Sequence, residues 1–462
     1  MTVSMPRSDV LIVGSGFSGI ALASQLVRTS KAIKIEVVDS NSPEQLGLAY
    51  RKGRLPHLLN VPAAGMSAFP DDPGHFKNWA NAVGIDLSDR TFARRADYAN
   101  YLCDLRTKLK ESGQVRFLSD TVVSLMPRER SWLASLLSGQ SLEAKKVVLS
   151  YGNVAPAAPP CLESIVDHPN FYANPWVSLM PEVVANWKSV CVIGSGLTAV
   201  DICLYLDSIG FKGMFELVSR HGLLPHPHRF GYAPLEKRLV PDPKSNLRAL
   251  IKAFRQAARE AVSQNGDWRA VMDAIRPNVA EYWCALSLHD QLRFLDHVRC
   301  FWDIHRHRMP PELSERINEL QSSGRLRIHG GMLRQTSAAE GNLSLEVTHR
   351  GGGLVQMSSV DAVFNCTGSP ADIQAWKSAL LNNLLASGFA APHPTRLGLR
   401  CDANGALLSR DGKVSPGLYA LGILRRGELW ESTAVPDLRI QAARLARFIC
   451  EQSEYSKENC KT

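Results

Sequence analysis

The sequence lacks a long apolar run: no stretch approaches the roughly 18 uninterrupted apolar residues that a membrane-spanning helix needs. Its first ten residues lack the apolar region of a secretory signal peptide. None of its 10 cysteines forms a CxxC pair, which argues against a zinc site and against a dithiol reductase. We therefore expect a cytoplasmic protein with no membrane partner and no metal. Six cysteines lie in apolar surroundings, as reduced thiols of a cytosolic protein do: Cys103, Cys191, Cys203, Cys284, Cys366 and Cys450.

Clustered charge and acid–base catalytic motifs are lacking as well. The net charge of +9 comes from arginines and lysines spread along the chain, a balance that suits anionic cofactors. No motif supports a nucleic-acid partner. No Ser–His–Asp arrangement and no pair of carboxylates has the spacing of a catalytic motif. At 462 residues, with 45% apolar and 21% charged residues, the composition is that of an ordinary soluble globular protein.

The clearest positive feature is a glycine-rich turn at residues 14–19. An apolar strand, 10–13, leads into it, an apolar helical pattern follows, and a second strand, 35–38, ends in Asp39. This is the context of a dinucleotide-binding turn, in which the glycines let the backbone approach a pyrophosphate and the acid accepts hydrogen bonds from a ribose. Because the turn lies near the N-terminus and a second one follows, we expect FAD here. The predicted cofactor contacts are Gly14, Gly16, Phe17, Ser18, Gly19, Asp39 and Ser40.

A second nucleotide turn begins at residue 194, after the strand 189–193 and before a helix over 200–206. The next strand, 215–218, ends in Ser219, Arg220 and His221 instead of an acid. An acid would repel a ribose 2′-phosphate, whereas arginine and serine can bind one. NADPH is therefore the expected second cofactor; the alternative is that Arg220 is a solvated charge. The predicted contacts are Gly194, Gly196, Leu197, Thr198, Ser219 and Arg220.

Other candidate contacts follow from loops and strand ends. A long aperiodic segment runs from residue 47 to residue 79, and long ordered loops inside a domain are usually functional. The alternative is a surface loop packed by its own apolar residues. Buried strands over 146–150, 361–366 and 417–421 each lead to a glycine, and a last helix is expected over 437–451, with Pro436 near its first turn. The candidates are Leu59, Asn60, Val61, Met66, Gly152, Thr367, Gly368, Gly422, Thr433 and Ala434.

The composition turns helical between residues 241 and 324. The aromatic stripe of this stretch is more typical of a core than of a cofactor box. The run 303–308 contains two arginines and two histidines, Arg306, His307 and Arg308 among them. Two interpretations stay equally open for this run: contact with a phosphate or substrate, or a structural or solvated patch.

These patterns predict an α/β fold with two Rossmann-like dinucleotide-binding domains and an α-helical insertion. The two glycine turns are the only internal repeat. We expect an FAD-binding domain over 1–175 and 363–462, an NADPH-binding domain over 176–240 and 325–362, and the insertion over 241–324.

At these residues the chain resembles the two-dinucleotide flavoproteins of the glutathione-reductase-like class, and more closely the bacterial FAD–NAD(P)-binding proteins. The matching segments span nearly the whole chain: 14–19, 57–63, Met66, 194–199, 365–368 and 429–436. Asp437 stands where that family suggests Glu. A looser resemblance concerns class B flavin-containing monooxygenases, whose flavin-side loop is similar to Asn60, Met66 and 69–71. Their FxGxxxHxxxW fingerprint is absent from this sequence.

This resemblance implies an NADPH- and FAD-dependent monooxygenase. In such enzymes NADPH reduces the flavin, oxygen adds to give a flavin hydroperoxide, and a small molecule is oxygenated, here at an amine or hydroxylamine nitrogen. The cofactor carries the difficult step, which accounts for the missing catalytic motifs. The resemblance gives Asn60 a hydrogen bond to the hydroperoxide or to the nicotinamide amide; the alternative is a turn cap. The N-terminus of the last helix, near Thr433, would stabilise negative charge on reduced flavin.

Two other functions stay open. One is an FAD-dependent NAD(P)H oxidoreductase without oxygen insertion. The other is a nucleotide-binding redox sensor or scaffold, which the intact glycines of both turns disfavour. The expected partners are a small-molecule substrate and O2. Oligomeric state is undecided, since the insertion could face a partner subunit of a homo-oligomer as easily as a substrate.

Overall fold

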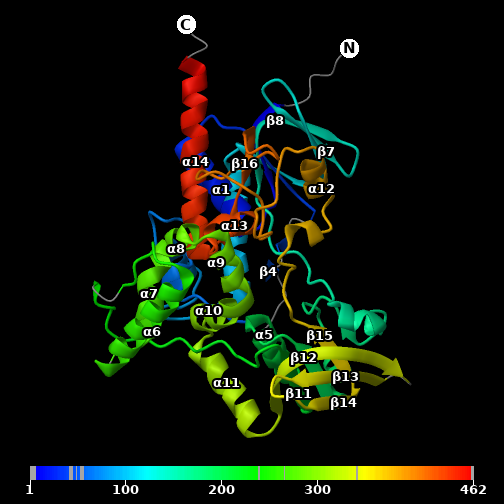
Figure 1. Cartoon of the computed structure of the whole chain (residues 1–462). Helices are drawn as coiled ribbons and strands as arrows, with labels where there is room; N and C mark the ends of the chain where they lie inside the picture. The colour runs from blue at the N-terminus through cyan, green and yellow to red at the C-terminus, as the bar shows by residue number, and fades with distance from the viewer. Residues whose placement is uncertain are drawn as a thin grey trace.

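A computed structural model describes residues 7–40, 45–47, 49–51, 57–237, 240–264, 266–339 and 342–458. Two β-sheets organise these residues and lie at opposite ends of the molecule (Figure 1). The first has the strand order β16-β17-β8-β1-β2-β5, with a β6–β7 hairpin attached to β8. Its strands are β1 (Arg7–Val13), β2 (Ile35–Asp39), β5 (Val115–Ser119), β6 (Val122–Pro127), β7 (Trp132–Leu136), β8 (Ser141–Leu149), β16 (Ala406–Leu408) and β17 (Val414–Ala420).

The second sheet has the order β14-β13-β12-β11-β10-β15-β9. Five of its strands pair in parallel, in the order β12, β11, β10, β15 and β9. At the other edge, β12, β13 and β14 form an antiparallel meander. The predicted α/β fold with two nucleotide-binding sheets is confirmed. The strands are β9 (Phe171–Tyr172), β10 (Ser189–Ile193), β11 (Met214–Ser219), β12 (Leu326–Ala339), β13 (Asn342–His349), β14 (Leu354–Val360) and β15 (Ala362–Asn365); a separate ribbon pairs β3 (Gln45–Leu46) with β4 (Tyr50–Arg51).

Helices cover both sheets and fill the space beside them. Among the described residues, no helix combines the length and apolarity that a membrane crossing requires. The helices are α1 (Phe17–Thr29), α2 (His75–Ala82), α3 (Arg95–Glu111), α4 (Pro181–Ala185), α5 (Leu197–Ser208), α6 (Leu247–Ser263), α7 (Arg269–Ile275), α8 (Val279–Ala285), α9 (Leu288–Arg293), a π-helical turn (Phe294–Val298), α10 (Arg299–Arg306), α11 (Pro311–Ser322), α12 (Ala379–Ala386), α13 (Arg426–Leu429) and α14 (Val435–Glu458).

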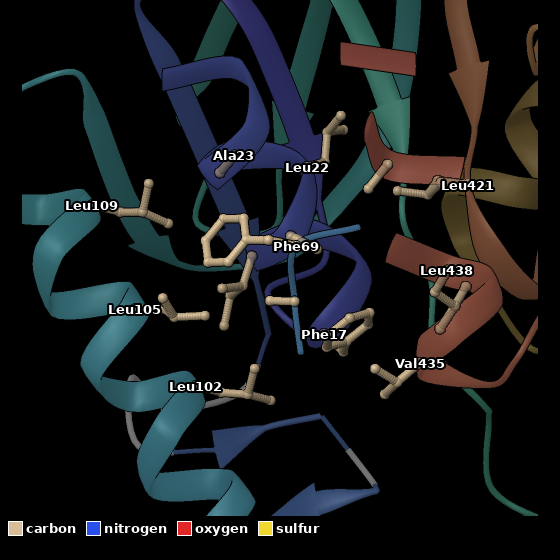
Figure 2. Close-up of a cluster of buried hydrophobic side chains, with 14 of the residues drawn as sticks. Phe17, Leu22, Ala23, Phe69, Leu102, Leu105, Leu109, Leu421, Val435 and Leu438 are labelled. Atoms are coloured by element: carbon tan, nitrogen blue, oxygen red, sulfur yellow. The ribbon is translucent and has the colours of Figure 1, made fainter. Parts of the chain in front are cut away.

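Alternation along β1 produces the two cores of the first domain. Val10 and Ile12 face a core made with α1, α3 and α14, while Leu11 and Val13 face one that includes α12 and the β6–β7 hairpin. Figure 2 shows the first core, where side chains of α3 and α14 point toward Phe17 at the start of α1. This packing fixes the N-terminus of α1 at the carboxyl end of the sheet.

The second sheet repeats this arrangement. Val190 and Val192 pack against α5 and α11, whereas Cys191 and Ile193 pack against β13 and a short helical turn at Pro160–Ile165. Helix α11 lies within the predicted insertion but belongs to the core of the second domain. In packing terms, the helices that form the separate core of the insertion end with α10.

Sheet membership and the predicted domain boundaries differ where the chain crosses between the sheets. Strand β9 lies before the predicted boundary at 175, and β15 lies across the one at 362, yet both belong to the second sheet. The two crossing segments run side by side. The Ser369 hydroxyl donates to the carbonyl of Val154 (2.6 Å), and the Asn365 amide donates to the carbonyl of Ala157 (3.2 Å). The two-residue strand β9 has no sequence pattern of its own and was not recognisable beforehand, whereas β15 was predicted as a strand but not assigned to this sheet.

The insertion has a core of its own, built from helices α6 to α10. The aromatic stripe lies in this core, as the sequence predicts: Tyr282, Trp283 and Phe294 are buried there. Trp430 and Leu397 of the first domain complete the cluster. The insertion is thus packed onto the segment that leads into α14, beside both sheets (Figure 1).

Candidate functional site

The first glycine turn has the geometry that its sequence predicts. Gly14 has a φ of +110°, and a Cβ there would lie 2.6 Å from the carbonyl oxygen of Ser150. A Cβ on Gly19 would lie 2.0 Å from the carbonyl oxygen of Gly14. Ser150, directly after β8, donates its hydroxyl to that same carbonyl (2.9 Å). Both glycines are therefore required by close backbone contacts between β1, α1 and β8.

Asp39 at the end of β2 is held beside this turn. Its carboxylate accepts hydrogen bonds from the backbone N–H (2.6 Å) and the hydroxyl (2.9 Å) of Ser15. The acid and the first helix N-terminus thus share one rim of the sheet, which is the relation that the spacing of the motif predicts.

A cleft of about 440 Å³ opens at this rim. Eight of the predicted residues line it: Gly14, Gly16, Phe17, Ser18, Asp39, Ser40, Gly152 and Thr433. The sequence reading missed further lining residues, which include Tyr50, Thr121, Tyr151, Asn153, Asn174 and Ser432. Thr121 follows the carboxyl end of β5 closely, and Tyr151 that of β8, so the rule that ligands bind at carboxyl ends of parallel strands could have found them.

The second turn reproduces the first on the other sheet. Gly194 has a φ of +114°, and a Cβ there would lie 2.5 Å from the carbonyl oxygen of Cys366, which follows β15. The Ser195 hydroxyl donates to Ser219 Oγ (2.8 Å), so the hydroxyl of Ser219 already braces the turn. Because two turns that lie far apart in the chain adopt the same backbone geometry, the sequence repeat is also a structural repeat.

A second cleft, of about 300 Å³, lies in front of this turn and joins the first. Four predicted residues line it: Leu197, Thr198, Thr367 and Gly368. Ala49, Asn153, Val154 and Ile423 line both clefts, so the two clefts adjoin. The residues missed by the sequence reading include Arg95, Trp176, Asp201, Arg299 and Arg426.

Cationic side chains dominate the second cleft. Arg95 pairs with the buried carboxylate of Asp201 (2.9 Å), and Arg299 pairs with Asp303 (3.3 Å). Burial, and then the charge of Arg299, lower the pKa of Arg426 to about 10, a value at which it stays protonated at neutral pH. Three guanidinium groups around one cleft suit an anionic ligand such as a dinucleotide phosphate.

Asn60 lies in a loop that hydrogen bonds hold from three sides. Leu59 donates its N–H to the carbonyl of Ala93 (2.9 Å), and Arg95 donates its N–H to the carbonyl of His57 (2.9 Å). His228 Nε2 donates to the carbonyl of Asn60 (3.0 Å), because a carbonyl can only accept. Burial, with the nearby charge of Arg308, lowers the pKa of His228 to about 4, so its ring is neutral at physiological pH.

Several predicted contacts line neither cleft among the described residues. Leu59 and Met66 are buried in the first core, so the structure gives them a packing role. Arg220 is exposed just beyond β11, where its neighbour His221 meets Arg350 at 2.7 Å. The full set that lines neither cleft is Gly19, Leu59, Asn60, Val61, Met66, Gly194, Gly196, Ser219, Arg220, Gly422 and Ala434.

The two arginines of the run 303–308 are buried in ion pairs. Arg306 is buried and faces the carboxylates of Glu431 (3.5 Å) and Asp437 (3.6 Å). Arg308 is buried and pairs with Asp273. Neither arginine lines the clefts, which favours the structural interpretation of the two.

The two clefts fit two dinucleotides. Helices α1 and α5 both have a glycine at the N-cap position and no side-chain cap, so backbone N–H groups at both N-termini are available to phosphates. The Ser432 hydroxyl in the wall of the first cleft is fully buried, with no hydrogen-bond partner among the described residues. No group of three or more metal-ligating side chains occurs among the described residues.

The fold and the joined clefts together define a two-dinucleotide-binding flavoprotein, the class that the sequence resembles. Comparison with protein families supports this class: residues 11–154 match the FAD-NAD(P)-binding model. Within the class, residues 86–227 match the model of the L-lysine 6-monooxygenases and L-ornithine 5-monooxygenases. The expected resemblance and the expected FAD and NAD(P) cofactors are confirmed. No curated protein sequence matches the chain.

Solved structures share the whole fold. An ornithine hydroxylase from Pseudomonas aeruginosa is 16% identical, with 96% of this chain and 99% of that chain covered and a TM-score of 0.66. An L-lysine 6-monooxygenase from Pseudomonas syringae is 18% identical over 96% and 99% of the two chains, with a TM-score of 0.64. A flavin-containing monooxygenase from Stenotrophomonas maltophilia is 15% identical over 97% and 100%, with a TM-score of 0.55.

Proposed function

We propose that the protein is an NADPH-dependent flavoprotein monooxygenase that oxygenates a small molecule at an amine or hydroxylamine nitrogen. The observation that carries this proposal is the pair of adjoining clefts, one beside each glycine turn, in which two dinucleotides would meet end to end. The family match over residues 86–227 supports the nitrogen as the oxygenated atom. Bound FAD, once reduced by NADPH, supplies the oxygen-activating chemistry.

The chain's own residues would bind and orient the two cofactors. The N-terminus of α1 and Asp39 would hold the FAD pyrophosphate and ribose in the first cleft. The N-terminus of α5, with Arg95 and Arg426, would hold the phosphates of NADPH in the second. The N-terminus of α14, which begins at Val435, would face the flavin and favour negative charge there.

Asn60 would act from the loop that His228 and Arg95 hold in place. Its amide is the polar group that we assign to the hydrogen bond with the reacting oxygen or the nicotinamide amide. Because its carbonyl is engaged by His228, the backbone of Asn60 is fixed even where the side chain exchanges partners.

A second candidate is a flavin oxidoreductase that passes electrons on without inserting oxygen. A disulfide-reducing version of this function has little support, because none of the described residues that line the two clefts is a cysteine. Burial also raises the pKa of Cys191 and Cys203, which disfavours a reactive thiolate at either position.

The deciding experiment follows the fate of electrons in the purified, FAD-loaded protein. NADPH is added without oxygen, oxygen is then admitted, and a panel of primary amines and hydroxylamines is screened for oxygenated product. We expect an amine that raises NADPH consumption with product formed in near-equal amount. If NADPH reduces the flavin but hydrogen peroxide is the only product of oxygen with every compound of the panel, the result would instead support the second candidate.

Asn60→Ala tests the assigned role of the amide. We expect NADPH oxidation to continue while the ratio of product to NADPH falls about tenfold or more, with peroxide making up the difference. Asn81→Ala is a control, because that asparagine is exposed on α2, outside the loop that contains Asn60. A normal product ratio in Asn60→Ala removes Asn60 from the reaction.

A further inference from the structure

The segment between α13 and α14 contains an unusual backbone conformation that no sequence pattern predicts. Trp430 has a φ of +58° and a ψ of −60°, and Glu431 donates its N–H across it to the carbonyl of Leu429 (2.6 Å). This is the rare γ-turn with positive φ, which a large side chain adopts only when surrounding structure holds it there. Such turns concentrate at functional sites.

The helical insertion supplies the structure that holds Trp430. Its indole stacks on Trp283 of α8 (centroids 5.1 Å apart, 26° between planes) and meets the ring of Phe294 edge-on (5.1 Å). Trp283 in turn donates its indole N–H to the carbonyl of Gly427 in α13 (2.6 Å). The guanidinium of Arg426 lies over the indole of Trp430 at 4.9 Å. The turn is therefore enclosed by aromatic rings that belong to another part of the fold.

The next residue is held by the insertion as well. Glu431 is buried, and its carboxylate accepts the indole N–H of Trp302 on α10 (2.8 Å). Arg306 at the end of the same helix faces Glu431 (3.5 Å) and Asp437 in the first turn of α14 (3.6 Å). Despite burial, the charges of His307 and Arg306 and the bond from Trp302 lower the pKa of Glu431, so it is ionised at neutral pH.

The residues that follow this clamped turn form a wall of the first cleft. Ser432 and Thr433 line it, and the Ser432 hydroxyl has no partner among the described residues. Arg426, at the other end of α13, lines the second cleft. One short segment, 426–433, thus borders both clefts and is held from outside by the insertion.

We propose that Trp430 and Glu431 are positioning residues, through which the helical insertion sets the segment 432–434 against the flavin cofactor. The proposal rests on FAD occupying the first cleft and does not depend on oxygen insertion. Released from the insertion, Trp430 would leave its positive φ, and the Ser432 hydroxyl and the start of α14 would turn from the cleft. Flavin affinity would then depend on helices that do not themselves line the flavin cleft.

Trp302→Phe is the sharpest test, since it removes the N–H donor to Glu431 and keeps an aromatic ring in the insertion core. FAD is titrated into the apoprotein by fluorescence, and unfolding of the apoprotein is followed in parallel. We expect the FAD dissociation constant to rise about tenfold, as for loss of a hydrogen bond to a charged group. Glu431→Gln, which keeps the shape but removes the charge, should act in the same direction.

Phe301→Leu is the matched control, because Phe301 is the adjacent residue of α10 and its side chain is exposed. It should leave the FAD dissociation constant unchanged. Trp430→Phe should retain affinity because a ring still fills the space beside Trp283, whereas Trp430→Gly should lose it even though glycine tolerates the positive φ.

The circular dichroism of bound flavin adds a readout that stability alone does not move, and we expect it to change in Trp302→Phe and Glu431→Gln. The proposal is overturned if both variants bind FAD with normal affinity and spectrum while the apoprotein unfolds at lower temperature. The insertion would then only stabilise the fold. If the parent protein oxygenates no amine or hydroxylamine while the variants change FAD affinity as expected, the proposed function is contradicted and this inference still stands.

Discussion

At the scale of single residues, the two glycine turns separate backbone geometry from cofactor contact. Gly14 and Gly194 have positive φ values, and a Cβ on either would clash with the carbonyl of the residue that follows the neighbouring strand, Ser150 after β8 or Cys366 after β15. Gly16 has neither constraint: its φ is −68°, and no atom lies within 4 Å of a Cβ built there. We therefore infer that the first glycine of the motif is needed for folding and the second for close contact with the ligand.

Exchange of these glycines for alanine tests that division. Gly14→Ala should lower the free energy of unfolding by about 3 kcal/mol, because the side chain meets Ser150 in a strained conformation. Gly16→Ala should change stability by no more than about 0.5 kcal/mol. It should nevertheless lose bound FAD, because a Cβ would separate the backbone from the pyrophosphate. Chemical unfolding and flavin content measure the two effects; equal destabilisation by both variants would contradict the division.

Arg220 carries the prediction of NADPH over NADH. Its side chain is exposed beyond β11, and the guanidinium of Arg350 lies near by, where it donates to the ring of His221, the residue next to Arg220. Arg220→Ala should raise KM for NADPH about tenfold and leave KM for NADH nearly unchanged, since only NADPH carries the 2′-phosphate. Arg327→Ala, an exposed arginine on β12, is a suitable control. Equal effects on both coenzymes would reject the assignment.

At the scale of elements, α13 carries a half-buried acid, Glu428, with an unusual pKa. Burial raises the pKa of Glu428 to about 7, against the backbone N–H of Cys401 and the charge of Arg425, which both lower it. The folded protein thus holds a proton on Glu428 at pH values where the unfolded chain has released it. Stability contributed by this proton is present in acid and is lost as the pH rises from about 4.5 to about 7.

Glu428→Gln mimics the protonated acid and should remove this loss. The variant and the parent should have similar unfolding free energies near pH 4.5. The variant should become more stable by up to about 3 kcal/mol at pH 8, because each unit of pKa shift corresponds to about 1.4 kcal/mol. Urea unfolding at several pH values measures the difference. A constant difference across this range would show that Glu428 does not titrate as described.

At the scale of the whole molecule, the two domains are joined by a buried ion pair. Arg95 of α3 in the first domain contacts Asp201 of α5 in the second (2.9 Å), and His57 lies 3.7 Å from the same carboxylate. Because Arg95 also lines the second cleft, this contact links the relative position of the domains to the site assigned to NADPH.

Arg95→Gln tests that link. The variant should lose about 3 kcal/mol of stability, because Asp201 stays buried without its strongest partner. It should also raise KM for NADPH several-fold and keep its FAD, since Arg95 does not line the first cleft. Arg94→Gln, the exposed neighbour in sequence, is the control. Loss of FAD without a change in KM for NADPH would contradict the assignment of the second cleft.

The sequence predicted what is local in the chain. Strand, turn and helix follow one another within about thirty residues, so both nucleotide turns and the acid Asp39 were recognisable from order and spacing. Arg299 and Arg426 were not, because tertiary packing brings them to one cleft from segments more than a hundred residues apart. The start of α14 at Val435 instead of residue 437 is an ordinary boundary difference. The buried use of Arg306 depends on partners at residues 431 and 437, which no local pattern indicates.

The paired crossing of the chain between the sheets has an evolutionary and practical consequence. Since the residues around 154–157 and 365–369 touch, everything between them leaves and re-enters the first domain at one place. We expect that such a unit could be exchanged between related scaffolds through two adjacent splice points, and that its coenzyme preference would move with it. The exchange would succeed only where the recipient has a counterpart of Trp430, because the helices of the insertion pack around that indole.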